Sequence, residues 1–190
     1  VKNEVMTGVR NVDWIRVYVP KGSELLSAEG FGAPDEKYFN EKPDVSWVES
    51  EFLEKENRAL TDENSMTKVY EENNKTVFAN WLMVDPAQTA VVVITYRLAF
   101  NFLDQAPKTD WLSKFNSFLN PDQKNLIPYS LLVQKQPGAK PSEFSSILLL
   151  PTDWLVFWRY PESIRGENGW DISDKLNSDK FWSILIEKNN

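Results

Sequence analysis

Short segments in which apolar and polar side chains alternate recur along this chain, and most of them end at Pro, Gly or Asn. In residues 12–19, Ile15, Val17 and Val19 point one way, while Trp14, Arg16 and Tyr18 point the other. A repeat of two residues is typical of a β-strand, and the Pro-Lys-Gly sequence that follows is typical of a turn. This pattern restricts the chain to folds that are built from short strands.

The same reasoning predicts a series of further strands. They are a strand beginning at Leu25 and strands over residues 67–71, 76–84, 89–98, 127–136, 144–150, 154–160, 170–173 and 180–187. Asn73 and Asn74 tolerate the positive φ that a tight hairpin needs between two of these strands. Punctuated strands with little helix predict a mainly β fold, an antiparallel β-sandwich (immunoglobulin-like or related), rather than a doubly wound α/β fold.

Two stretches interrupt the strand pattern with helical spacing. Val45, Val48 and Phe52 follow Asp44, which can serve as an N-cap, so a short helix is expected near residues 44–58. A second helical or loop insertion is expected near residues 110–120, where the apolar residues at i, i+4, i+7 and i+8 are Trp111, Phe115, Phe118 and Leu119. No linker divides the chain, so residues 1–190 are expected to form one domain.

The most apolar ribbon, residues 77–98, is predicted to be the central hairpin of the sandwich. Asp85 and Pro86 separate its two strands. In the second strand the uniformly apolar side is predicted to face the core, and it consists of Val92, Ile94, Tyr96 and Leu98.

Composition limits the chemistry of the chain. It has no Cys and no His, which removes thiolate nucleophiles, disulfides and the commonest general base and metal ligand. No cofactor, metal site or catalytic motif is therefore predicted, and the chain is expected not to be an enzyme. A polysaccharide-processing enzyme that uses two carboxylates stays as a third hypothesis. The acids crowd into residues 35–63, a stretch interpreted as a solvated loop and helix.

The best oxygen cluster for calcium lies near the C-terminus, and turn chemistry explains it more simply. It lacks the ligand spacing of an EF-hand, and its residues are Asp171, Asp174, Asn177 and Asp179. The net charge of −7 argues against nucleic-acid binding. The apolar runs are too short to span a bilayer, so no direct membrane insertion of this segment is expected.

Eight Trp residues are many for a chain of 190. Residues 154, 158 and 160 of the strand over 154–160 share parity, so they are predicted to lie on one side of it. Together with Trp170 they are a candidate carbohydrate platform, and the four residues are Trp154, Trp158, Tyr160 and Trp170. The favoured interpretation is that this side packs into the core, as most large aromatic side chains do.

Three segments together resemble the C-terminal region of a family of large bacterial surface proteins of unknown function. They are IRVYVPKGSEL (residues 15–25), the ribbon over residues 77–98, and YSLLVQKQPG (residues 129–138). The resemblance covers roughly residues 9–138. The family often has Gly where this chain has Ala87.

The resemblance implies location more than activity. It implies an extracytoplasmic β-sandwich at the cell surface, anchored in the membrane through a segment upstream of Val1. The leading hypothesis is a non-catalytic domain of a bacterial envelope protein that acts in adhesion, spacing or protein contact. The alternative is a carbohydrate-binding module, so the expected partners are an envelope protein or a cell-wall glycan.

Overall fold

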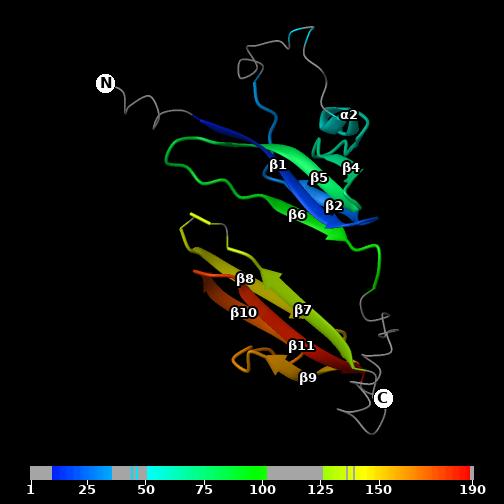
Figure 1. Ribbon diagram of the computed structural model, residues 1–190, viewed down its shortest axis with the longest axis vertical. Helices are drawn as coiled ribbons and strands as arrows, with labels where there is room; N and C mark the ends of the chain where they lie inside the picture. The colour runs from blue at the N-terminus through cyan, green and yellow to red at the C-terminus, as the bar shows by residue number, and fades with distance from the viewer. Residues whose placement is uncertain are drawn as a thin grey trace. The chain divides into compact units, whose positions relative to one another are not determined.

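A computed structural model describes residues 10–35, 44, 46, 51–101, 126–135, 137–138 and 140–188. The chain divides into two compact units, Val1–Phe100 and Asn101–Asn190, and each is described by itself (Figure 1). That residues 1–190 form a single domain stays a prediction.

The first unit contains two antiparallel sheets and a short helix. One sheet has the strand order β1-β5-β4-β3 and the other pairs β2 with β6. The elements are β1 (Asn11–Pro20), β2 (Glu24–Glu29), α2 (Glu51–Asn57), β3 (Leu60–Thr61), β4 (Lys68–Glu72), β5 (Lys75–Val84) and β6 (Val93–Arg97). The helix α2 lies within the range of the predicted helix near residues 44–58, of which residues 45 and 47–50 lie outside the described residues.

The hairpin between β4 and β5 has the predicted turn. Asn73 and Asn74 have φ of 49° and 58°, the left-handed values that a two-residue type I′ turn requires. Glu72 pairs with Lys75 at the end of the ladder. The local chemistry of the two Asn side chains therefore fixes the register of both strands.

The prediction that residues 77–98 form one hairpin is wrong. β5 pairs with β1 and β4, whereas β6 pairs with β2 in the other sheet. The turn after Asp85 is closed by Gln88 N donating to Asp85 O at 3.0 Å, and strand pairing resumes only at Val93. A connection of this length does not impose the tight pairing of a two-residue turn, so β6 can join the other sheet.

The two sheets of the first unit contact each other through aromatic rings. The buried Phe78 of β5 and Tyr96 of β6 have ring centroids 5.9 Å apart. Tyr96 belongs to the apolar side of residues 92–98 that was expected to face the core, but Val92, Tyr96 and Leu98 are exposed, so that prediction is wrong for these three residues. The opposite face of the larger sheet carries Val77 and Ala79, which form a second buried cluster with Tyr70 of β4.

The second unit is a small two-layer sandwich of antiparallel strands. Its strands are β7 (Ile127–Val133), β8 (Ser142–Leu149), β9 (Trp154–Tyr160), β10 (Gly169–Leu176) and β11 (Lys180–Lys188). One layer has the order β7-β11-β9 and the other pairs β10 with β8. Side chains from both layers meet in one core, among them Trp170 and Ile172 of β10 and Trp182, Ile184 and Ile186 of β11.

The mainly β, antiparallel fold predicted from the sequence is confirmed. The immunoglobulin-like assignment stays a prediction. The second predicted insertion, near residues 110–120, lies outside the described residues.

Candidate functional site

A β-bulge in β9 decides where the predicted platform residues lie. Val156 pairs with Ile186 of β11, but the next pair is Trp158 with Leu185, so Phe157 is an extra residue. An extra residue reverses the side to which the following side chains point. The prediction that Trp154 shares a side with Trp158 and Tyr160 is therefore wrong.

Two of the four predicted platform residues belong to the core of the second unit. Trp170 is only 2% exposed, and its indole N–H donates to Ser146 Oγ at 3.2 Å. Its ring lies 5.1 Å from that of Tyr129. Trp154, which precedes the bulge, is half-buried and packs against the same core cluster. Neither residue lies on the surface that carries Trp158.

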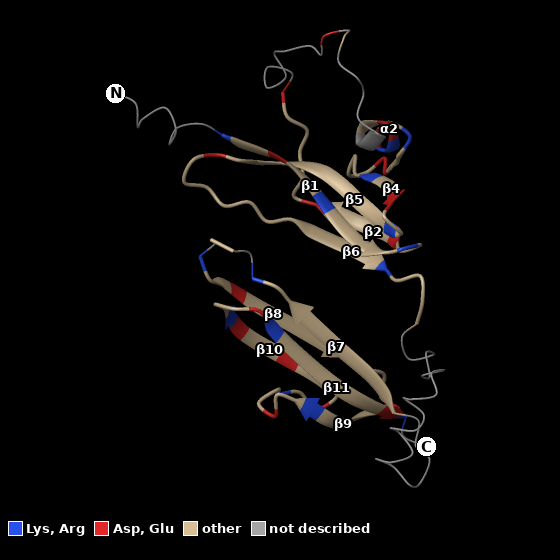
Figure 2. Cartoon of the chain, viewed as in Figure 1, with Lys and Arg blue, Asp and Glu red and all other residues tan. Residues whose placement is uncertain are grey.

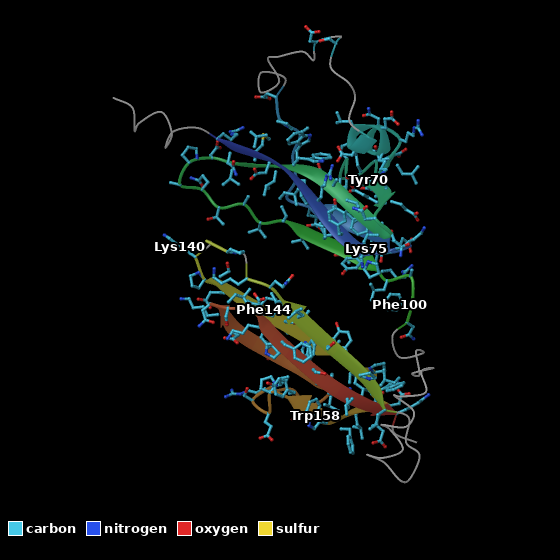
Figure 3. All side chains as sticks on the ribbon, in the orientation of Figure 1. Tyr70, Lys75, Phe100, Lys140, Phe144 and Trp158 are labelled. Atoms are coloured by element: carbon cyan, nitrogen blue, oxygen red, sulfur yellow. The ribbon has the colours of Figure 1, made fainter. Side chains whose placement is uncertain are left out.

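Trp158 and Tyr160, which follow the bulge, are exposed on the outer face of the three-stranded sheet. They are 46% and 53% exposed. Their ring planes are nearly parallel, at 14°, and their centroids lie 6.2 Å apart. Phe181 of β11 is 47% exposed, and its ring centroid lies 6.3 Å from that of Tyr160. We refer to Trp158, Tyr160 and Phe181 as the aromatic face; Trp158 is labelled in Figure 3.

Sequence reasoning missed Phe181, although a signal for it exists. In residues 180–188 the side chains of Trp182, Ile184 and Ile186 are buried at every second position. Phe181 has the opposite parity, so the strand pattern itself turns it outward. The bulge at Phe157 has no comparable signal, because residues 154–160 contain no Gly or Pro to mark it.

The rest of the outer face is apolar and nearly free of charge. Leu132 pairs with Phe181, and Leu155 lies at the other end; both are exposed. Figure 2 shows β7 without a charged residue. At the outward positions of this sheet, Glu187 is the one acid or base among the described residues.

The structure also brings together a network that the sequence analysis did not predict. The Glu56 carboxylate of α2 accepts hydrogen bonds at Oε1 from Trp14 Nε1 at 3.1 Å, from Arg16 Nη2 at 2.5 Å and from Tyr70 Oη at 2.9 Å. Lys68 Nζ donates to the Glu56 carbonyl at 3.1 Å. We call these five residues the Glu56 network. It lies between α2 and one face of the larger sheet, where Figure 3 labels Tyr70.

A second buried carboxylate lies on the same face. Glu72 Oε2 accepts a hydrogen bond from Tyr18 Oη at 2.7 Å and lies 3.5 Å from Arg16 Nη1. The guanidinium of Arg16 therefore lies between two buried acids, Glu56 and Glu72. Glu56 comes from the acidic stretch that was interpreted as solvated, so that interpretation is wrong for this residue.

The electrostatics of the network favour an ionised Glu56. Burial raises the pKa of its carboxyl, but hydrogen bonds from Trp14, Tyr70 and Arg16 outweigh burial and hold the pKa below its usual value. Burial and the bond to Glu56 raise the pKa of Tyr70. An ionised carboxylate with three donors is a hydrogen-bond acceptor and not a source of protons, so the arrangement is suited to fastening α2 to the sheet.

Two of the acids considered for calcium, Asp174 and Asp179, have other partners. Asp174 lies 3.1 Å from Lys180 Nζ, and Asp179 Oδ1 accepts a hydrogen bond from Lys135 N at 2.8 Å. Within the described ranges, no group of three or more acids is placed to hold a metal ion. No helix in the part of the chain that the structure describes has the length and apolar character needed to cross a bilayer.

No family model, curated protein or solved structure matches this chain. The resemblance to bacterial surface proteins stays a prediction. The aromatic face and the Glu56 network are therefore the observations on which a functional proposal can rest.

Proposed function

We propose that this chain is a non-catalytic binding domain of a bacterial envelope protein, and that its aromatic face contacts an apolar surface of a partner protein. The observation that carries the proposal is the exposure of Trp158, Tyr160 and Phe181 on one sheet face with little charge around them. Contiguous exposed apolar surface on a soluble domain commonly marks an interaction site.

The residue types of the aromatic face support protein contact. Trp, Tyr and Phe are enriched in protein interfaces, and charged residues are depleted from the interface centre. Trp and Tyr are also enriched among hot-spot residues, the interface residues whose truncation to Ala costs the most binding energy. The nearly parallel rings of Trp158 and Tyr160 are carried on a paired strand, so little side-chain entropy is lost on binding.

A glycan is the second candidate partner, because nearly parallel aromatic rings are suited to the apolar faces of sugar rings. A sugar also needs hydrogen-bond partners for its hydroxyl groups. The neighbours of the rings include the aliphatic Leu132 and Leu155, and the hydroxyl of Ser183 already donates to Tyr129 O at 3.3 Å. The chemistry of the face therefore favours a protein over a glycan.

The cellular setting is part of the proposal. The extracytoplasmic, membrane-anchored location rests on the resemblance of residues 9–138 to bacterial surface proteins. Access of an added protease or antibody to this domain on intact cells tests it: protection until the cells are lysed would contradict the location without affecting the aromatic face.

The contact itself can be tested with two variants, each of which removes exposed apolar side chains. A Trp158→Ala/Tyr160→Ala variant removes the stacked pair, and Leu60→Ala removes an exposed apolar side chain of the first unit. Each is immobilised and exposed to envelope extract, retained proteins are identified, and the affinity of each purified candidate is then measured.

We expect a partner to bind the unmodified chain and Leu60→Ala with equal affinity. Loss of one hot-spot Trp or Tyr typically costs more than 2 kcal/mol, so the double variant should bind at least about 30-fold more weakly. Equal binding by all three chains contradicts the proposal. If a purified glycan binds the unmodified chain but not the double variant, the partner of the aromatic face is a glycan.

A further inference from the structure

The two strands of the smaller layer of the second unit differ in how their outer edges are covered. β8 and β10 pair only with each other in this layer, so each strand has one edge that the other does not cover. On that edge of β10, Asp171 N donates to Arg165 O at 2.7 Å, so the loop before β10 pairs with it. No described strand pairs with the corresponding edge of β8. We call it the exposed edge of β8.

Alternate residues of β8 direct their backbone groups to this exposed edge. Leu150 N donates to Asn168 O at 3.3 Å at the end of the β8-β10 ladder. Hydrogen bonding alternates along an antiparallel ladder, so the even-numbered residues of β8 bond to β10. The N–H and C=O groups of the odd-numbered residues, Ser145 and Ile147 among them, therefore point to the exposed edge. The same alternation directs Asp171 N away from β8, in agreement with its bond to the loop.

The side chains of β8 do not protect the exposed edge. Edge strands of soluble proteins are commonly protected by Pro, Lys or a bulge. Residues 142–149 contain no Pro or Lys and pair with β10 without a bulge, and their one charged residue, Glu143, lies 3.6 Å from Lys175 Nζ. The outward side chains of Ile147 and Leu149 are 69% and 81% exposed. The edge therefore offers backbone groups and apolar side chains together, which is what an added strand uses.

The inner side of β8 is incompletely covered as well. Phe144, which is labelled in Figure 3, stacks on the ring of Trp182 with centroids 5.4 Å apart. Phe144 and Leu148 are only partly buried, whereas Trp170 and Ile172 of the neighbouring β10 are buried in the same core cluster. A further strand beside β8 would cover the two partly buried side chains.

A second copy of β8 fits this edge when it runs antiparallel about a two-fold axis at Ser146. Opposite residues in an antiparallel pair have side chains on the same face, and a two-fold contact uses the same residues of both copies. The arrangement pairs backbone groups that point to the exposed edge in both copies, and no like charges lie opposite each other. Its cross-strand pairs are Phe144 with Leu148, Ser145 with Ile147, and Glu143 with Leu149 of the second copy.

We propose that the exposed edge of β8 pairs with β8 of a second copy of this chain, so that two β8-β10 layers form one four-stranded antiparallel sheet. Self-pairing carries the choice of a second copy as the occupant, because it places Phe144 against Leu148 on the inner side of both copies. The aromatic face takes no part in this contact, so either proposal can fail without the other.

The oligomeric state of the whole 190-residue chain tests the proposal. Sedimentation equilibrium from about 10 μM to about 1 mM covers the affinities of small interfaces, and we expect a reversible monomer–dimer equilibrium. Ser145→Pro removes an N–H at the exposed edge and should weaken the dimer at least about tenfold. Ser173→Pro is the matched control, because Ser173 lies opposite Ser145 and directs its N–H away from β8. It should leave the dimer unchanged.

Two charge variants test the orientation of the strands without a change to the backbone. Ser145→Lys/Ile147→Lys places like charges opposite each other across the two-fold axis, and so does Ser145→Glu/Ile147→Glu. Both positions are exposed, so each variant should fold. Each alone should be monomeric where the unmodified chain is a dimer, and an equimolar mixture should form a dimer that contains one copy of each.

Melting temperatures show whether each variant is folded, and the charge variants decide the result if Ser145→Pro does not fold. The proposal is overturned if the unmodified chain is a monomer over the whole concentration range. It is also overturned if the folded Ser145→Pro variant or both charge variants dimerise normally, or if the charge variants do not associate when mixed. A dimer that is lost only in Trp158→Ala/Tyr160→Ala overturns it as well and assigns the contact between copies to the aromatic face.

Discussion

The Arg16 guanidinium donates to the Glu56 carboxylate at 2.5 Å and so joins β1 to α2 across 40 residues of sequence. The Glu56 side chain is 9% exposed and the Arg16 side chain 28% exposed, so solvent screens this pair less than a surface ion pair. A helix of seven residues has little stability of its own. The position of α2 on the sheet therefore depends on Glu56 and its donors.

Replacing Glu56 with Gln should destabilise the chain by about 2–3 kcal/mol, because buried hydrogen bonds to a charged group are lost and Arg16 keeps its charge. The free energy of unfolding in urea measures this. Glu54→Gln is the matched control on the same helix: its ion pair with Arg58 is exposed and 3.9 Å long, so its loss should cost less than about 0.5 kcal/mol. Equal effects of the two substitutions would show that the Glu56 network does not stabilise the fold.

The contribution of Glu56 should depend on pH in a defined direction. Its folded pKa is lower than the unfolded value of about 4.3, so the stabilisation is present above that pH and is lost as the pH falls through the folded pKa. The difference in unfolding free energy between the unmodified chain and Glu56→Gln should stay constant from about pH 7 to 5.5 and shrink below about pH 4. A difference that grows on acidification would contradict the ionised state of Glu56.

Strands could be predicted from the sequence because they depend on local chemistry. Alternation in residues 12–19 and the Asn73-Asn74 turn specify β1 and the β4-β5 hairpin through neighbouring residues alone. Strand partners depend on contacts between distant residues, and the assignment of β6 to the sheet of β5 was wrong.

The candidate site was predictable only in part, for a similar reason. Exposure of Trp158 depends on the bulge at Phe157, which arises from pairing with β11. The burial of Glu56 depends on donors from three other segments. A signal did exist in β1, where Trp14, Arg16 and Tyr18 alternate with aliphatic residues. If that face is covered, the charge of Arg16 needs an opposite charge beside it.

Replacing a buried and an exposed Trp of the second unit should lower the free energy of unfolding by clearly different amounts. Trp170→Ala empties a core position and leaves the Ser146 hydroxyl without its donor, so it should cost about 3–5 kcal/mol. Trp158→Ala removes an exposed ring that stacks on Tyr160 and should cost about 1 kcal/mol. Thermal or urea unfolding of both variants measures the difference. Comparable losses would show that Trp158 is a core residue and would remove the basis of the aromatic face.

The stability of the β4-β5 hairpin should depend on whether the residue at position 74 tolerates a left-handed backbone conformation. Asn74 has φ of 58°, which Gly adopts without strain and which costs an Ala residue about 1–2 kcal/mol. Asn74→Ala should therefore lower the free energy of unfolding by about 1 kcal/mol, while Asn74→Gly should leave it unchanged or raise it slightly. A more stable Asn74→Ala variant would contradict the type I′ turn.

Replacing Ala87 with Gly should raise the free energy of unfolding. It is an exposed residue with φ of 61°, a conformation that costs a residue with a Cβ about 1–2 kcal/mol. Ala87→Gly removes this strain but makes the unfolded chain more flexible, which costs about 0.4–1 kcal/mol, so a net gain of about 0.5–1 kcal/mol is expected. Ala90→Gly, in the same connection but without a positive φ, bears only the unfolded-state cost and should be destabilised by about that amount. Urea unfolding of both variants measures the contrast, and a loss of stability in Ala87→Gly would show that the turn after Asp85 does not hold Ala87 in the left-handed conformation.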